Sequence, residues 1–308
     1  MRPFRFGAQL GASTAGEWAG QLGAARDLGY SIVTLADHFG GRLAPLTALA
    51  AAVDQVDLRL GTLVLANDFR HPAVLAKETA TLDSLSGGRF ELGIGAGWLA
   101  DDYLSSGITM ETAGVRIDRL EEAIAVIKGL WGPGSFTYEG RYYTADLDGH
   151  PKPLQRPRPP ILIAGGGRRI LRLAGREADI VGISIRLDEG RRAQLDKGVV
   201  SATREAVEQK LGWIRDGAGG RYDELELNVL VFEAHVTASP REVLERIGAE
   251  TGTDPALVRE SPQVLVGSVE EICDTIGRRR ETFGISYYTF YEPDLVTMAP
   301  VVARLTGR

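Results

Sequence analysis

Residues 59–94 read RLGTLVLANDFRHPAVLAKETATLDSLSGGRFELGI and carry one complete unit of the fold. The apolar runs at 59–65 and 89–94 predict two strands that are buried on both faces. Between them, apolar residues recur at helical spacing over 73–85, which predicts an amphipathic helix. A strand, a helix and a second strand in this order are typical of a parallel sheet with helices packed against it.

The same alternation runs along most of the chain. It predicts strands at 4–10, 31–37, 161–164, 180–185, 225–232 and 285–290, and helices at 15–28, 46–56, 116–130 and 169–177. Eight strands that alternate with helices predict an α/β fold, the (β/α)8 TIM barrel. A doubly wound open sheet is the alternative.

Three stretches do not follow the repeat, namely 99–115, 131–160 and 186–201. We expect them to be loop insertions after strands 4 and 6 of the barrel. The second contains a hairpin-like segment, 136–143, and ends in a proline-rich arm that is expected to be extended polyproline II. The polar third stretch is either a mobile lid or disordered. Because the insertions interrupt one repeat, we expect residues 1–308 to form a single domain.

The composition excludes several classes of protein. Hydrophobic residues make up 44% of the 308 positions and charged residues 25%, which is ordinary for a globular chain. The formal net charge of −6 argues against nucleic-acid and anionic-membrane partners, since both need a basic surface. No apolar run approaches about 20 residues, and the single cysteine, Cys273, cannot form an internal disulfide. We therefore expect a soluble, cytoplasmic protein.

In a barrel of this type the functional residues lie at the C-terminal ends of the strands. The sharpest signal there is Gly165-Gly166-Gly167, which follows the fifth strand and opens a helix with Arg168 and Arg169 in its first turn. Free backbone N–H groups at a helix start and nearby guanidinium groups together suit a phosphate. A tight turn with solvated arginines is the alternative. No Gly-Lys-Ser/Thr follows, so this is not a Walker loop.

A second glycine string, GIGAG at 93–97, follows the fourth strand. It lacks the GxGxxG spacing of a dinucleotide-binding turn, and no clear helix opens directly behind it. We interpret it as backbone that lies against a flat ligand.

His38 ends the second strand beside Asp37. A neighbouring carboxylate fixes the tautomer of an imidazole and suits it to proton transfer, which makes His38 a candidate catalytic residue; a structural histidine is the alternative. The other three histidines are scattered, and no metal site is expected. Aromatic residues near strand ends either line a pocket for a planar molecule or pack under loops: Trp98, Tyr103, Tyr287, Tyr288 and Tyr291.

Several spaced motifs resemble the bacterial luciferase-like superfamily. They are ADHF at 36–39, GTLVLA at 61–66, RHPA at 70–73, TLDSLSGGR at 81–89 and GIGAGW at 93–98. The likeness looks closest to the branch of oxidoreductases that depend on the deazaflavin coenzyme F420, and it extends to about residue 182.

The resemblance implies a barrel, usually dimeric, that holds a flavin or deazaflavin at the C-terminal ends of its strands. It also implies that the third strand ends in a bulge, often with a non-prolyl cis peptide, behind one face of the cofactor ring. His38 matches the proton donor or acceptor beside the ring. The implied cofactor contacts are Val64, Leu65 and Ala66 on the ring face; Asp37 on the ring or its ribityl chain; Ala96, Gly97 and Asp101 on the ring edge and tail; and Gly165, Gly166, Gly167 and Arg168 on the phosphate.

The chain departs at two positions from the F420-dependent sugar-phosphate dehydrogenases that it resembles. Those enzymes carry a glutamate directly after the GxGxG segment, where this chain has Trp98, and an acidic residue after the first strand, where it has GAST at 11–14. The carboxylates that handle a sugar are therefore missing. We predict an apolar or aromatic substrate instead, in a pocket that contains Trp98, Tyr103 and Tyr291.

Three functions follow from the resemblance. The first, which the closer likeness favours, is an oxidoreductase that moves a hydride between coenzyme F420 and an organic substrate, with His38 handling the proton. The second is a monooxygenase that uses FMNH2, the reduced form of FMN. A second copy of the chain and a flavin or F420 reductase that supplies the cofactor are the expected partners. The third function, a non-catalytic binder related to luciferase accessory proteins, predicts a lost phosphate loop or a lost His38, and both are present.

Overall fold

The computed structural model describes residues 1–186 and 203–308. Its main sheet has the strand order β3-β2-β1-β13-β10-β9-β8-β5-β4, and a further pairing of β3 with β5 closes it. All of these pairings are parallel. The strands are β1 (Arg5–Leu10), β2 (Ile32–Leu35), β3 (Arg59–Thr62), β4 (Leu65–Ala66), β5 (Phe90–Gly95), β8 (Ile161–Gly165), β9 (Ile180–Ile183), β10 (Glu226–Val231) and β13 (Ile285–Tyr291).

β3 and β4 are the two halves of one interrupted strand, because both pair with β5 at successive points along it. The closed sheet is therefore an eight-stranded parallel barrel. The predicted (β/α)8 fold is confirmed, and closure excludes the open sheet.

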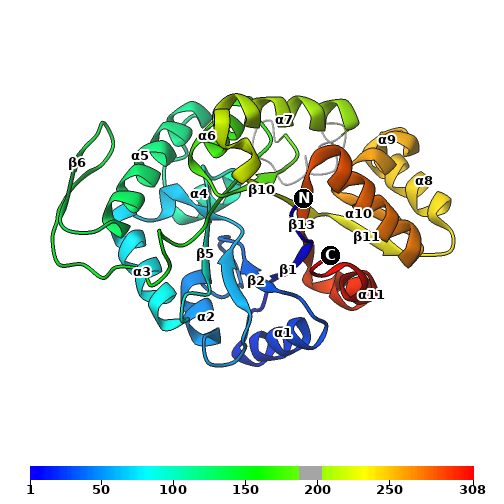
Figure 1. The fold of residues 1–308 in the computed structure, drawn as a ribbon, viewed down its shortest axis with the longest axis horizontal. Coiled ribbons are helices and arrows are strands. Elements are labelled where there is room, and N and C mark those ends of the chain that lie inside the picture. The colour runs from blue at the N-terminus through cyan, green and yellow to red at the C-terminus, as the bar shows by residue number, and fades with distance from the viewer. Residues whose placement is uncertain (187–202) are drawn as a thin grey trace.

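Helices surround the barrel in a ring (Figure 1). They are α1 (Ala15–Asp27), α2 (Pro45–Ala52), α3 (Pro72–Leu85), α5 (Ala113–Trp131), α6 (Arg168–Glu177), α7 (Arg204–Ala218), α10 (Val269–Phe283) and α11 (Leu295–Leu305). Each predicted helix is present, although α2 ends four residues before the predicted end.

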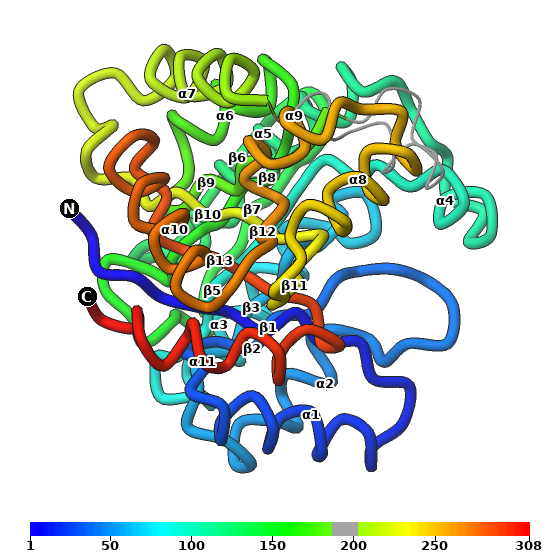
Figure 2. The backbone as a smooth tube through the Cα atoms, turned by 90° about the vertical axis from the view of Figure 1, so that its right-hand side faces the viewer, coloured from blue at the N-terminus to red at the C-terminus, as the bar shows by residue number. Residues whose placement is uncertain are grey.

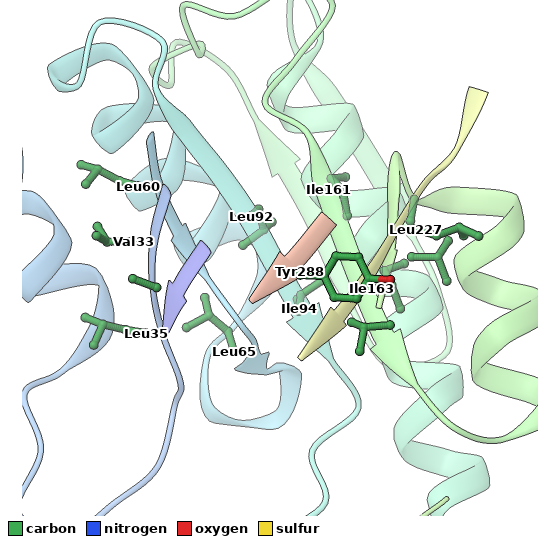
Figure 3. Packing of buried hydrophobic residues seen from close by; sticks show 14 of the residues in the cluster. Val33, Leu35, Leu60, Leu65, Leu92, Ile94, Ile161, Ile163, Leu227 and Tyr288 are labelled. Carbon is green, nitrogen blue, oxygen red and sulfur yellow. The ribbon is translucent and has the colours of Figure 1, made fainter. Parts of the chain in front are cut away.

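Side chains alternate between the outside and the inside of the barrel. Ile161 and Ile163 belong to the large cluster between strands and helices, part of which Figure 3 shows. Leu162, between them in sequence, belongs to a separate cluster with Ile32 and Tyr287. This two-residue period explains why the strands read as nearly continuous apolar runs.

A charged layer fills the N-terminal end of the barrel. Arg5 bonds Glu91 at 2.8 Å and Glu226 at 2.7 Å, and Arg59 bonds Glu91 at 2.5 Å. Since β1 pairs with neither β5 nor β10, the two ion pairs of Arg5 cross the barrel interior, whereas Arg59 and Glu91 lie on the paired strands β3 and β5. The opposite, C-terminal end holds the candidate site residues.

The remaining elements lie outside the eight-fold repeat. They are η1 (Asn67–Phe69), α4 (Ala100–Ser106), β6 (Phe136–Glu139), β7 (Thr144–Leu147), η4 (Gly219–Glu224), β11 (Glu233–Val236), α8 (Pro240–Thr251), α9 (Pro255–Glu260), β12 (Val264–Gly267) and η5 (Glu292–Asp294). Figure 2 shows both chain termini at one end of the barrel and α4 at the other. None of the helices in the two described segments is long and apolar enough to cross a membrane.

The insertions differ from the prediction in detail. The stretch 99–115, expected as a loop, contains helix α4, whereas the expected hairpin is present as β6 and β7. The proline-rich arm, expected to be extended, bends at 154–157, where Asp83 accepts hydrogen bonds from the backbone N–H groups of Leu154 and Gln155 at 2.7 and 2.9 Å. Of the third stretch, 186–201, all but residue 186 lies outside the described residues.

Candidate active site

The interrupted strand forms a bulge at the C-terminal end of the barrel. The peptide bond between Leu63 and Val64 is cis, as the resemblance implied for this position. The Gln9 side chain of β1 donates to the Leu63 carbonyl at 3.2 Å. The Ala66 N–H donates to the Asp37 carboxylate at 3.1 Å. A side chain of β1 and one that follows β2 therefore hold the two ends of the bulge.

The glycines at 93–97 make room for this bulge and for a tyrosine. A Cβ on Gly93 would lie 1.7 Å from the carbonyl oxygen of Thr62, and one on Gly95 would lie 2.9 Å from a methyl group of Val64. Gly97 has a φ of +75° and would place a Cβ 2.0 Å from the Tyr103 hydroxyl. Protein atoms thus occupy the space that a side chain at these three positions would need, so packing accounts for the glycines, and the contact of this backbone with a flat ligand stays a prediction. A short helix, α4, also follows three residues later, which was not expected.

Asp37 is buried and bound on both oxygens. Arg70 donates two hydrogen bonds to it, at 2.5 and 3.1 Å, in addition to the one from Ala66. A bidentate guanidinium–carboxylate pair has a fixed geometry. Asp37 therefore anchors the bulge to the segment before α3, although it is next to His38 in sequence.

The carboxylate that bonds His38 is Asp102 of α4. The His38 Nδ1 and an Asp102 oxygen are 2.6 Å apart, and the second Asp102 oxygen accepts the backbone N–H of Phe39 at 3.0 Å. Trp98 packs edge-on against the imidazole, with 5.9 Å between ring centres. Asp101, the predicted cofactor contact one residue earlier, is exposed at the start of α4.

Tyr103 is buried behind the site rather than on its surface. Its hydroxyl donates to Asp68 at 3.2 Å, and its ring packs on Phe69, which in turn packs on Phe39. Burial, and then the charge of Asp68, raise the pKa of the Tyr103 hydroxyl. Burial also raises the pKa of Asp68, more than the nearby Arg119 lowers it. Of the predicted pocket residues, Trp98 and Tyr291 are partly exposed and Tyr103 is not.

The glycine loop at 165–167 joins β8 to α6. A Cβ on Gly165 would lie 2.4 Å from the Ile170 side chain, and one on Gly166 would lie 2.1 Å from the Ile185 carbonyl oxygen. Gly167 is the N-cap of α6, and a Cβ on it would meet no described atom within 4 Å. Packing thus requires two of the three glycines, and the third leaves the helix start open.

The first turn of α6 fits an anion. Among the described residues no side chain caps this ten-residue helix, so its first N–H groups are available to a ligand. Arg169 is turned to α5, where it donates to Asp118 and to the Gly114 carbonyl. Arg168 is exposed and has no ion pair within the described segments.

The barrel brings most of the predicted residues to one end. His38, the bulge at 64–66, the segment 96–98, the loop at 165–168 and Tyr291 all follow C-terminal ends of parallel strands. Sequence reasoning missed Asp102. Leu99, Asp102 and Tyr103 are buried at helical spacing, but the helix has seven residues, which is too short for this spacing to stand out in the sequence.

Comparison with known proteins adds relatives of two kinds. The family model described as luciferase-like monooxygenase matches residues 1–208. An FMNH(2)-dependent dimethylsulfone monooxygenase of Pseudomonas putida is 31% identical over 180 residues, which cover 58% of this chain and 49% of that protein. An F420-dependent glucose-6-phosphate dehydrogenase of Microbacterium testaceum is 38% identical over 167 residues, which cover 50% of this chain and 48% of that protein. The alignments thus span about half the length of each relative.

The fold recurs in solved structures. The coenzyme F420 dependent tetrahydromethanopterin reductase of Methanopyrus kandleri superposes with a TM-score of 0.77 at 19% identity, covering 99% of this chain and 98% of that one. At this identity the likeness establishes the shared fold.

Proposed function

Since this chain belongs to the luciferase-like monooxygenase family, we propose that it is an oxidoreductase that transfers a hydride between coenzyme F420 and an apolar or aromatic organic substrate. The observation that carries the proposal is the start of α6, which no side chain of the described segments caps, beside Arg168 and at the same end of the barrel as His38. The F420-dependent relative supports the choice of cofactor.

The chain's own residues would hold the cofactor at two places. The N–H groups of the first turn of α6, with Arg168, would bind the phosphate. Val64, Leu65 and Ala66 of the bulge would back the ring, while Ala96 and Gly97 would lie at its edge. F420, when bound, supplies the hydride chemistry, and the protein supplies orientation and a proton carrier.

His38 would carry the proton. In the oxidising direction, with F420 bound as the hydride acceptor, the imidazole would accept the proton from the heteroatom of the substrate; in the reducing direction it would return that proton. The Nδ1 of His38 already faces Asp102, so Nε2, on the other side of the ring, is the nitrogen that remains for the substrate.

The side chains around His38 favour an apolar or aromatic substrate over a sugar phosphate. Trp98 packs on the imidazole, and Phe39 and Phe69 extend the aromatic surface. The loop after β1 has no acid, and the first one beyond it is Glu17 in the first turn of α1, which accepts the backbone N–H of Ser13 at 2.8 Å. Neither position carries a carboxylate placed to bind sugar hydroxyls, although the F420-dependent relative is a glucose-6-phosphate dehydrogenase.

The first test is a titration of the protein with F420 and, separately, with oxidised and reduced FMN. The four tryptophans, Trp98 among them, report binding by fluorescence quenching. We expect F420 to bind, and Arg168→Ala to weaken binding about tenfold, as loss of a charge-assisted hydrogen bond does. Arg172→Ala, which removes an exposed arginine one turn further along α6, is the matched control.

The activity assay separates substrate classes. We expect turnover of enones, imines or alcohols with apolar groups and none of glucose 6-phosphate. Fast oxidation of glucose 6-phosphate would overturn the substrate class but not the cofactor. Failure to bind either cofactor would overturn the proposed function.

A second candidate is an FMNH2-dependent monooxygenase. The specific observation in its favour is the FMNH(2)-dependent relative of Pseudomonas putida, which is 31% identical over 58% of this chain. It would require a reductase that supplies reduced FMN. Preferential binding of reduced FMN in the titration would support it.

A further inference from the structure

Asp102 forms a bridge between two strand ends that do not pair. It lies in α4, which follows β5, and it bonds His38, which follows β2. In the barrel the interrupted strand separates β2 from β5. The side chain of Asp102 is only 8% exposed, and each of its oxygens has one donor, the His38 Nδ1 or the Phe39 N–H.

This contact determines which imidazole nitrogen carries the hydrogen. A neutral imidazole has one N–H, and an ionised carboxylate only accepts hydrogen bonds. At 2.6 Å from the carboxylate, Nδ1 must therefore be the protonated nitrogen. Nε2 then holds a free lone pair and is ready to accept a proton.

The contact is not needed to dock α4. Tyr103, the next residue, is buried, bonds Asp68 and packs on Phe69. Its hydroxyl also fills the space that Gly97 leaves. Burying the Asp102 carboxylate costs free energy, because the charge loses its water. Since Tyr103 already anchors α4, the docking of the helix does not account for this cost.

We infer that Asp102 is a positioning residue: its carboxylate holds His38 as the Nδ1–H tautomer, so that Nε2 exchanges the proton with the substrate. The role of Nε2 rests on the proposed function. The tautomer and the orientation of the ring do not, and they are measurable in the protein without cofactor.

The test is the 15N NMR spectrum of the histidine side chains at a pH where the imidazoles are neutral. The chain has four histidines, and His38→Gln identifies the signal of His38 by its loss. We expect wild-type His38 to show a protonated Nδ1 and an unprotonated Nε2. Asp102→Leu should shift the population toward the Nε2–H form, and Asp102→Asn, which retains one acceptor oxygen, should shift it less. Asp27→Asn, which removes an exposed carboxylate of α1, should change nothing.

A wild-type His38 that is protonated on Nε2, or a tautomer that does not change in either Asp102 variant, would overturn the inference. If Asp102→Leu does not fold, Asp102→Asn alone decides between these outcomes. In turnover assays with F420, we expect Asp102→Leu to lower kcat about 100-fold, the range of a positioned general base, with the affinity for F420 unchanged. Failure to bind F420 would remove the proposed function and leave the NMR result intact.

Discussion

Gln9 of β1 donates its side-chain amide to the carbonyl oxygen of Leu63, at 3.2 Å in the barrel interior. That carbonyl belongs to the cis peptide that interrupts the third barrel strand. The oxygen of Gln9 in turn accepts the hydroxyl of Thr34, at 2.5 Å. Because β2 lies between β1 and β3, the side chain of Gln9 must reach through the barrel interior to bond the Leu63 carbonyl. Gln9 therefore supports the backbone that we propose lies behind the cofactor ring.

Replacing Gln9 with leucine keeps a similar volume and removes the donor. The buried Leu63 carbonyl then lacks this partner, which should lower the free energy of unfolding by about 1–3 kcal/mol and weaken F420 binding. Urea denaturation and fluorescence titration measure the two effects. Gln55→Leu, at an exposed position after α2, should change stability by less than about 0.5 kcal/mol. A Gln9→Leu protein with wild-type stability would contradict the prediction.

Glu91 makes stability depend on pH at the acidic end. Burial raises the pKa of this carboxyl, but attraction to Arg5 and then to Arg59 outweighs burial, so that the pKa is lower than usual. Such a group stabilises the fold fully above its unfolded pKa, and the contribution is lost as the pH falls through the folded pKa. We therefore expect wild-type stability to fall as the pH drops below about 4.5.

Glu91→Gln should lower the free energy of unfolding at neutral pH by about 3 kcal/mol, because it removes the buried carboxylate that Arg5 and Arg59 share and leaves Arg5 with Glu226 as its one ion-pair partner among the described residues. In the variant, the free energy of unfolding should also fall less steeply at acidic pH than in the wild type. Glu121→Gln is the control, since Glu121 and its partner Arg176 are both about half exposed and the change should be below about 1 kcal/mol. Urea unfolding at neutral and acidic pH tests both variants. Equal losses in the free energy of unfolding for the two substitutions would show that the charged layer stabilises the fold no more than an exposed ion pair does.

The barrel was predictable because its strands are buried on both faces. The run 161–164 is apolar at every position, the run 59–65 is apolar apart from Arg59 and Thr62, and the helices keep a helical period. The position of the glycine loop after β8 followed from the same reading. Strand order and closure then bring His38 and residues 165–168 to one end of the barrel.

Contacts between distant segments were not predictable from local patterns. The partner of His38 lies 64 residues away on a helix of seven residues, which is too short for a clear periodic signal. The glycines at 93–97 look ready for a ligand, yet the bulge and Tyr103 fill their space. The parallel pair β11 and β12, with α8 and α9 between them, also was not predicted.

Lys210 should make stability rise with pH in the alkaline range. Burial lowers the pKa of this ammonium to about 8, while it donates to the Ser184 carbonyl at 2.8 Å. In the unfolded chain the group stays charged to about 10.5. Between these values the unfolded state binds more protons than the folded state, so the free energy of unfolding increases with pH.

Lys210→Met should remove this increase, which amounts to about 3 kcal/mol over the full range. Urea unfolding at several pH values between 8 and 10 measures it. Lys77→Met, at an exposed position of α3, should keep the wild-type slope. A wild-type protein whose stability does not change over this range would show that Lys210 stays charged in the folded state.

The glycine loop offers a test that separates packing from ligand binding. Gly166 faces the Ile185 carbonyl, where a Cβ would lie 2.1 Å away, whereas a Cβ on Gly167 would meet no described atom within 4 Å. Gly166→Ala must push the loop away from the end of β9, and we expect a loss of about 1–3 kcal/mol in the free energy of unfolding. Gly167→Ala keeps a φ of −99°, which alanine adopts, and should cost about 1 kcal/mol or less.

If the cofactor phosphate lies on the start of α6, the affinity for the cofactor should depend on Gly167, whereas the stability depends on Gly166. An alanine methyl at Gly167 would project where the phosphate approaches the N–H groups, so this variant should stay folded and lose affinity for F420 and FMN. Calorimetric titration beside urea unfolding gives both quantities for each variant. If Gly166→Ala is as stable as Gly167→Ala, packing does not explain the glycine at position 166. If Gly167→Ala binds both cofactors as well as the wild type, the phosphate lies elsewhere.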